Sequence, residues 1–246
     1  MEQLAIWIVG IGAGALYGLF GAGGAAFATP VLALVGVPAT FAIAAPLPAM
    51  LPTSLAGARS HLRAGSLDRR VATLAVAGGV PGTLIGGLAS GRIGGHWLLV
   101  LSAVMLLVVG ARVLLPDPTG HADRCDARRD RTALIVTLAF AVGILTGLLA
   151  NGGGFLLVPA FILVLGLSTA AAAGTSLVVA GVLSIPTLLV HWQLGHIDWR
   201  IALLFALGSV PGTFLGLRMA EHIDARSART AFGVLLVAFA AFFLLR

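Results

Sequence analysis

Long apolar runs separated by short polar gaps dominate this chain. Ten runs can be followed, at 4–20, 25–37, 39–58, 71–90 and 97–115, then at 133–150, 155–167, 169–192, 201–217 and 230–245. Most approach the roughly 20 apolar residues that a helix needs to cross a bilayer. The pattern therefore predicts an all-α, polytopic integral membrane protein with two sets of five segments.

Composition supports this class of protein. Of the 246 residues, 59% are hydrophobic and 10% charged, whereas roughly 25% are charged in an ordinary soluble domain. All 15 basic residues are arginine, and the formal net charge is +6. The arginines fall in the gaps between runs, where they orient a membrane protein and meet lipid headgroups, so we expect no nucleic-acid partner.

The two sets of runs resemble each other in sequence. The series Gly14, Gly18, Gly23, Gly24 and Pro30 matches Gly143, Gly147, Gly152, Gly153 and Pro159 at an offset of 129. Gly65, Asp68 and Arg70 match Gly195, Asp198 and Arg200 at an offset of 130, as does the tetrapeptide Val-Pro-Gly-Thr at 80–83 and 210–213. Such ordered matches indicate an internal repeat.

The repeat divides the chain into a first membrane repeat at 1–115, a charged linker at 116–131 and a second membrane repeat at 132–246. Five crossings per repeat would make the repeats inverted, an arrangement common in secondary transporters. The positive-inside rule then predicts a multi-pass cell-membrane protein with a cytoplasmic linker and both termini outside. Runs 25–37 and 155–167 are shorter than a full span, so they are expected either to cross or to be re-entrant.

A glycine-rich break precedes each short run, at 21–24 and 151–154. Exposed backbone at membrane depth must face protein or a wet cavity, and the helix that starts there points amide groups and a positive dipole end at it. Two such ends from inverted repeats would converge near the midplane. We therefore expect an anion site that includes Gly23, Gly24, Asn151, Gly152, Gly153 and Gly154. The alternatives are that these glycines only allow close helix packing and that Asn151 only caps a helix.

Hydroxyl and cationic side chains near the third run of each repeat add candidates. Thr53, Ser54, Thr175 and Ser176 lie inside these runs, and Arg59 and His191 lie at their ends. Hydroxyls can bind a substrate oxygen, although in membrane helices they often bond to the preceding turn. A cation at a cavity mouth attracts anions, and interfacial snorkelling is the alternative.

The sequence contains no motif for a buried ion site, a disulfide, a metal site or catalysis. All nine carboxylates lie outside the apolar runs or at their edges, so no buried proton relay or sodium site is expected. The one cysteine, Cys125, excludes an intramolecular disulfide and a cysteine-based metal set. No catalytic or metal motif is present, and the chain is expected to be neither an enzyme nor dependent on a cofactor.

These motifs together resemble the TauE/SafE-type sulfite exporters, also called toluene-sulfonate uptake permeases. The second repeat carries the resemblance best, with Gly143-x3-Gly147, Asn151-Gly152-Gly153-Gly154-Phe155, Pro159, Gly174-Thr175-Ser176-Leu177 and Gly195-His196-Ile197-Asp198-Trp199. The first repeat departs from the pattern, because Ala45-Pro46-Leu47-Pro48 replaces Thr-Ser-Leu. These prolines predict a kink in the run at 39–58.

The resemblance implies a plasma-membrane transporter of small sulfur-containing anions such as sulfite or organosulfonates. An inside-negative potential of ~100 mV contributes ~2.3 kcal/mol per negative charge moved out, so export needs no proton relay. Our interpretation is a secondary transporter that works by alternating access. A non-transporting membrane scaffold and an anion channel are the alternatives.

Overall fold

The computed structural model describes residues 2–20, 25–63, 65–115, 132–150, 154–220 and 225–244, and within these ranges every regular element is an α-helix. The helices are α1 (Glu2–Phe20), α2 (Ala25–Leu34), α3 (Ala39–Ala44), α4 (Leu47–Arg63), α5 (Arg69–Ser90), α6 (Gly95–Leu114), α7 (Thr132–Leu149), α8 (Gly154–Leu163), α9 (Thr169–Gln193), α10 (Trp199–Ala220) and α11 (Ala225–Leu244). The predicted kink is confirmed, because the third run divides into α3 and α4 at Ala45 and Pro46.

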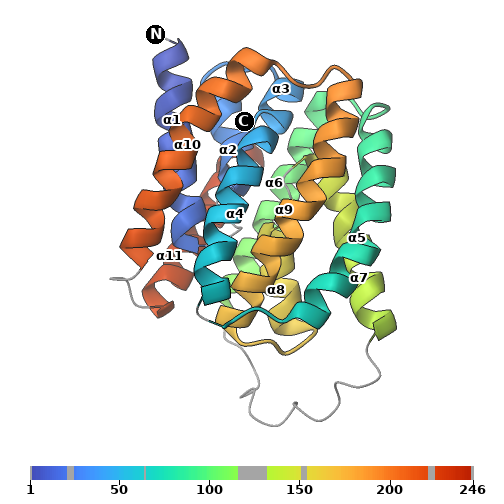
Figure 1. The fold of residues 1–246 in the computed structure, drawn as a ribbon. Helices are drawn as coiled ribbons and strands as arrows, with labels where there is room; N and C mark the ends of the chain where they lie inside the picture. The colour runs from blue at the N-terminus through green and yellow to red at the C-terminus, as the bar shows by residue number, and fades with distance from the viewer. Residues whose placement is uncertain are drawn as a thin grey trace.

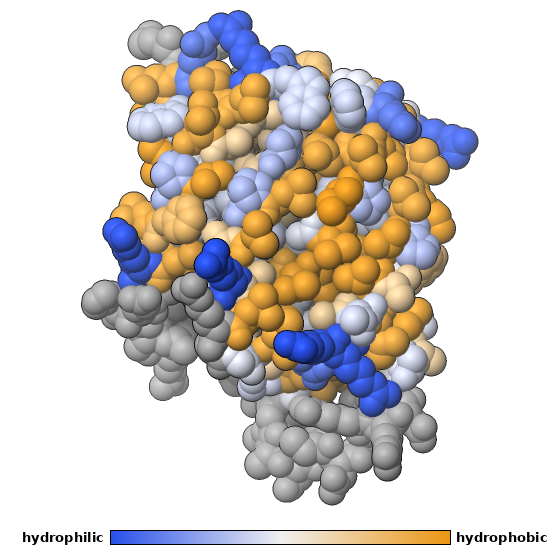
Figure 2. All heavy atoms as spheres, viewed as in Figure 1, coloured by the Kyte–Doolittle hydropathy of each residue, from blue (hydrophilic) through white to orange (hydrophobic). Residues whose placement is uncertain are grey.

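Among the residues that the structure describes, six segments are long and apolar enough to cross a membrane, judged by length and composition. They are Ala39–Arg59, Arg69–Ser90, Gly95–Leu114, Thr132–Leu149, Ala170–Gln193 and Trp199–Met219. Apolar side chains cover the middle of the face in Figure 2, and blue polar residues gather toward its two ends. Leu55, on α4, is 72% exposed, and Leu207, on α10, is 66% exposed. An outward apolar belt of this kind suits lipid contact, and the chain is a multi-pass membrane protein.

The tightest helix pairs join one half of the chain to the other. In Figure 1, α1 lies along α10, and α5 along α7. A Cβ placed on Gly14 would collide with the backbone of Ser209, and one on Gly82 would collide with the backbone of Phe140. Since such contacts leave no room for a side chain, glycine sets the closeness of both pairs.

Two ends of the bundle follow from these contacts. Arg70 at the start of α5 donates a 3.3 Å hydrogen bond to Thr132 Oγ1 at the start of α7, which defines the linker end, at the bottom of Figure 1. At the other end, here named the distal end, Gly91 after α5 lies beside Leu194 after α9. Helices α4 and α9 run antiparallel.

The short helices α2 and α8 have 10 residues each, or about 15 Å of helix. The chain nevertheless passes from one end to the other through each of them. Gly18, in the last turn of α1, lies beside Gly216 near the linker end of α10, whereas Ala39 at the start of α3 lies beside Gly95 at the distal end. The short segments are therefore parts of crossings and not re-entrant hairpins.

Helix ends are marked by residues with left-handed backbone. Gly65 after α4 and Gly195 after α9 have φ of 68° and 71°, and glycine adopts this conformation without strain. Ala150 after α7 also has a positive φ, of 53°, and is fully buried. A left-handed conformation costs an L-residue about 1–2 kcal/mol, so strain is stored immediately before the Asn151–Gly154 break.

A side chain added between α1 and α10 should lower the stability of the protein. We expect Gly14→Ala to lower the free energy of unfolding by about 1–3 kcal/mol, because the added methyl forces two backbones apart. Gly12→Ala is the matched control on the same helix, since a Cβ there meets nothing within 4 Å. Thermal unfolding in detergent measures both, and equal melting temperatures for the two variants would contradict the close-contact interpretation.

Ala150→Gly should have the opposite effect. Relief of the left-handed strain is expected to raise the free energy of unfolding by about 1 kcal/mol. Ala139→Gly, at a buried site inside α7, should instead lower the free energy of unfolding by about 0.5–1 kcal/mol. A destabilised Ala150→Gly variant in the same melting experiment would show that Ala150 is not strained.

Candidate functional site

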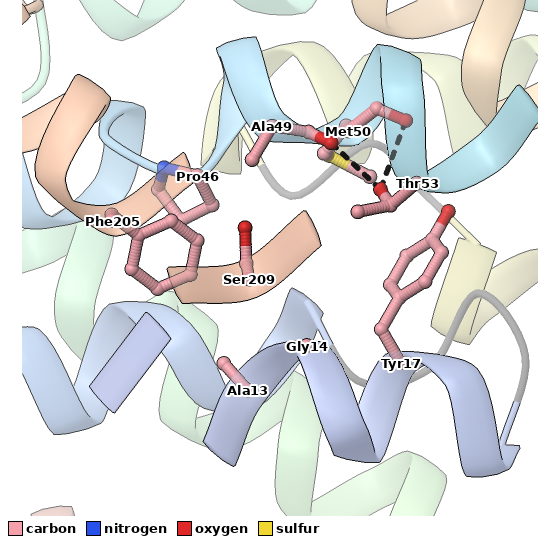
Figure 3. Close-up of a pocket in the computed structure, with 9 residues that line it drawn as sticks. All are labelled: Ala13, Gly14, Tyr17, Pro46, Ala49, Met50, Thr53, Phe205 and Ser209. Atoms are coloured by element: carbon pink, nitrogen blue, oxygen red, sulfur yellow. Dashed lines mark hydrogen bonds between the residues drawn. The ribbon is translucent and has the colours of Figure 1, made fainter. Parts of the chain in front are cut away.

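A small pocket lies between α1, α4 and α10 (Figure 3). It is lined by Ala13, Gly14, Tyr17, Pro46, Ala49, Met50, Thr53, Phe205 and Ser209. Its cavity volume is about 20 Å³, room for roughly one water molecule. The lining combines apolar groups with three hydroxyl side chains and has no charged residue.

The break between α3 and α4 supplies one wall of this pocket. Pro46, Ala49 and Met50 belong to the turn where α4 begins. Proline lacks a backbone N–H and interrupts the helical hydrogen-bond pattern, which is why one apolar run makes two helices here. Pro46, Ala49, Met50 and Thr53 lie on one side of the first turns of α4, so this side of the helix faces the pocket.

The hydroxyls at the pocket are hydrogen bonded within the protein. Tyr17 and Ser54 share a hydrogen bond of 2.7 Å between their hydroxyl oxygens, which joins α1 to α4. Thr53 donates to the carbonyl oxygens of Ala49, at 2.8 Å, and Met50, at 3.1 Å. Tyr17, Thr53 and Ser54 are buried. These bonds satisfy their hydroxyl groups without solvent.

These hydroxyls lie at mid-depth in the bundle. Gly181, at the middle of the 25-residue α9, packs against Ser54. Figure 3 shows the Ser209 hydroxyl pointing into the space between α10 and α4; its internal acceptor is the Ala206 carbonyl, at 3.4 Å. The pocket thus offers several hydroxyl groups near the depth where transporter sites lie.

Most of the predicted glycine site lies outside the described residues. This applies to Gly23, Gly24, Asn151, Gly152 and Gly153. The flanking helices can be placed, because α1 ends near the linker end and α7 ends near the distal end. Gly154 is the first residue of α8 and is buried.

The predicted hydroxyls of Thr175 and Ser176 are hydrogen bonded within the protein. Thr175 Oγ1 accepts a 3.1 Å hydrogen bond from the backbone N–H of Asp68, which ties α9 to the turn before α5. Ser176 Oγ donates to the Ala173 carbonyl at 2.9 Å. Neither residue lines the pocket, whereas Thr53 does and Ser54 bonds to its Tyr17.

The two predicted cations lie at opposite ends of the bundle. Arg59 is exposed in the last turns of α4, near the linker end. His191 is fully buried near the end of α9, and its Nε2 donates to the Gly147 carbonyl at 2.8 Å. No group of three potential metal ligands occurs among the described residues.

Sequence reasoning missed two hydroxyl-bearing residues of this pocket, Tyr17 and Ser209. Tyr17 is the single tyrosine of the chain, placed in an apolar run where a phenol needs a hydrogen-bond partner, and that signal was available. No sequence signal pointed to Ser209, because its position opposite Gly14 depends on the pairing of α1 with α10.

Known proteins with similar sequences place this fold in a family. The model of the sulfite exporter TauE/SafE family matches residues 6–243. A probable membrane transporter protein of Xylella fastidiosa (strain 9a5c) is 32% identical over 97% of this chain and 95% of its own length. The probable membrane transporter protein YjnA of Bacillus subtilis is 26% identical over 91% of this chain and 92% of its own. No solved structure matches. The chain belongs to the TauE/SafE sulfite exporter family of membrane transporters.

Proposed function

We propose that this protein is a secondary transporter of a small oxyanion, sulfite or an organosulfonate, and that the pocket between α1, α4 and α10 is part of the substrate site. The observation that carries the proposal is that the hydroxyls of Tyr17, Thr53 and Ser209 gather beside the first turns of α4 at mid-depth. Hydroxyl donors beside the first turns of a helix, where its dipole is positive, can stabilise an anion without a buried cation.

The chemistry of the pocket suits a sulfur oxyanion. Sulfite and sulfonate oxygens accept several hydrogen bonds, and the hydroxyl of Thr53 or Ser209 can turn from its own backbone carbonyl to such an oxygen. A hydrogen bond to a charged group contributes about 1.5–3 kcal/mol. No lining residue is acidic, so nothing at this pocket repels an anion.

Alternating access follows from the size of the pocket and from the helix pairs. A cavity with room for one water must widen to accept sulfite, so α4 has to move relative to the α1–α10 pair. We infer that the halves are inverted repeats, which the antiparallel α4 and α9 and the matching pairs α1–α10 and α5–α7 support. Each close pair then moves as one body, although its two helices come from different halves.

The direction and the surrounding residues complete the proposal. Export from the cytoplasm would follow from an inside-negative cell-membrane potential, with the linker inside and both termini outside. Arg59, exposed toward the linker end, would attract anions at the entrance. Gly23, Gly24, Asn151, Gly152, Gly153 and Gly154 would hold the anion elsewhere on its path.

Counterflow of labelled sulfite in proteoliposomes tests the substrate site. We expect saturable exchange, competed by an alkanesulfonate. Thr53→Val and Ser209→Ala should each raise the half-saturating concentration by about tenfold, the equivalent of one lost charged hydrogen bond. Ser184→Ala is the matched control, because Ser184 also bonds its own helix, at 2.7 Å to Gly181, but lies outside the pocket.

Other outcomes would favour the alternatives. Flux that does not saturate would indicate a channel, and a folded protein without any exchange would favour a scaffold. Wild-type affinity in both Thr53→Val and Ser209→Ala would move the substrate site away from this pocket.

The glycine break has its own test. We expect replacement of Gly153 by valine to abolish exchange while the protein stays folded and monodisperse in detergent, because the side chain would block the backbone amides that we propose bind the anion. Gly94→Ala controls for general damage, because Gly94 is also an interhelical glycine, has a φ of −62° and would place a Cβ with nothing within 4 Å. Loss of folding in Gly153→Val with flux retained in the surviving fraction would identify Gly153 as a packing residue.

A further inference from the structure

A pair of histidines at the distal end joins α9 to α7 and to the connection before α10. His191 Nε2 lies 2.8 Å from the Gly147 carbonyl oxygen, in the last turn of α7. The Nδ1 atoms of His191 and His196 lie 3.1 Å apart. His191 is fully buried, whereas His196 is half-buried. The pair therefore connects the outside of the bundle with a buried ring.

The hydrogen-bond partners fix the tautomers of both rings. A carbonyl oxygen only accepts, so His191 carries its hydrogen on Nε2 and its Nδ1 is a lone-pair acceptor in the neutral ring. His196 must then donate from Nδ1, which leaves its own Nε2 as the acceptor for a further proton. The two rings form an ordered chain that ends on the Gly147 carbonyl.

Few other charges reach this pair. Helix α9 packs on α4, α5, α7 and α8. The described residues of α7 and α8 carry no titratable group, and the charged side chains of α4 and α5 belong to their linker-end turns (Arg59, His61, Arg63, Arg69 and Arg70). At the distal end Arg92, His96 and Arg200 are exposed.

The carboxylate of Asp198, two residues after His196, is hydrogen bonded to the backbone. Asp198 Oδ1 accepts from the backbone N–H groups of Arg200, at 2.9 Å, and Ile201, at 3.2 Å. None of these hydrogen bonds reaches either histidine ring, so within the described residues each histidine has the other as its titratable hydrogen-bond partner. Burial lowers the pKa of His196.

The depth of the pair allows protons to reach it from water. Trp192, next to His191, is 56% exposed, and Trp199 is 41% exposed. Their rings meet edge to face with centroids 5.8 Å apart. Exposed tryptophans at helix ends are typical of the membrane–water interface, so His196 lies at that level.

The first half lacks such a pair at the equivalent place. His61 and Ser66 correspond to His191 and His196 at the offset of 130, and His61 Nδ1 lies 3.0 Å from Ser66 Oγ. A serine cannot bind a proton at neutral pH, so this half has the turn without the second imidazole. The chain thus supplies its own comparison.

We propose that His196 and His191 form a proton-binding relay that regulates the transporter from the distal end. Its regulatory part rests on the proposed transport function. A proton from water binds Nε2 of His196, and the Nδ1 hydrogen of His196 passes to Nδ1 of His191. His196 becomes neutral with its hydrogen on Nε2, and His191 becomes an imidazolium that still donates from Nε2 to Gly147.

The charge on His191 would tighten the closed distal end. A charged donor forms a stronger hydrogen bond to the Gly147 carbonyl than a neutral one, and a cation near the carboxyl end of α7 interacts favourably with its dipole. Both effects hold α9 against the last turn of α7, immediately before the Asn151–Gly154 break. Acid at this end therefore slows opening.

Nitrogen-15 NMR of histidine-labelled protein in nanodiscs tests the relay without any transport. At neutral pH we expect one ring protonated only on Nε2, assigned to His191, and one only on Nδ1, assigned to His196. Both signals should titrate together as the pH falls. His191→Gln keeps a donor for Gly147 and should change the tautomer and titration of His196, whereas His61→Gln should leave them unchanged. An unaltered His196 titration in His191→Gln would overturn the relay.

Transport at different pH tests the regulation. Ethanesulfonate is the probe, because its charge is constant over this range. Burial lowers the pKa of His196 below its ordinary value of 6.5. Wild-type flux should therefore begin to fall only below about pH 6.5, and should then drop by about tenfold per pH unit as the pair is protonated. His191→Gln and His196→Ser, which copies the first half, should flatten this decline at unchanged melting temperature. Equal acid inhibition in wild type and His191→Gln would refute the regulatory role. If no anion is carried, the proposed function fails and the regulatory part fails with it, while the NMR result alone decides the relay.

Discussion

Close backbone contact between helices of opposite halves is the constraint on which this structure depends. The lipid tails around a membrane protein provide no hydrophobic drive for helix association, so packing must supply it. Glycines along α1 and α10, and along α5 and α7, bring backbones together where a single methyl group would collide. Both close pairs cross the boundary between the halves, and this leaves α4 and α9 to meet between them.

The apolar pattern predicted the helices well because crossing a bilayer demands a minimum length of apolar residues. The split of the third run was also predictable, since Pro46 cannot continue the backbone hydrogen bonds of a helix. The pairing of α1 with α10 was not, because it depends on contacts between residues such as Gly14 and Ser209 that are far apart in the sequence. The direction of the short helices was not predictable either, because it depends on contacts of the flanking helices with their neighbours.

The candidate site was predicted in part, for similar reasons. Thr53 was a candidate from the sequence and lines the pocket, and Ser54 bonds to the pocket residue Tyr17. Thr175 was chosen by the same reasoning, yet it accepts a hydrogen bond from the backbone of Asp68. A hydroxyl in an apolar run shows only that a partner is needed. Whether that partner is the chain or a ligand depends on neighbours from other helices, and the same holds for His191.

In the transport cycle that we propose, the pocket opens to each side of the membrane in turn. Cys125 is the only native cysteine, so a Cys125→Ser background allows a single cysteine at Thr53 to be treated with membrane-impermeant thiol reagents. Leu55→Cys, on the exposed face of α4, is the control for reagent leakage into the bilayer. We expect labelling of the cysteine at position 53 from both sides of the vesicle, and protection by an alkanesulfonate. Labelling from neither side, or labelling that the sulfonate does not reduce, would contradict the proposed cycle.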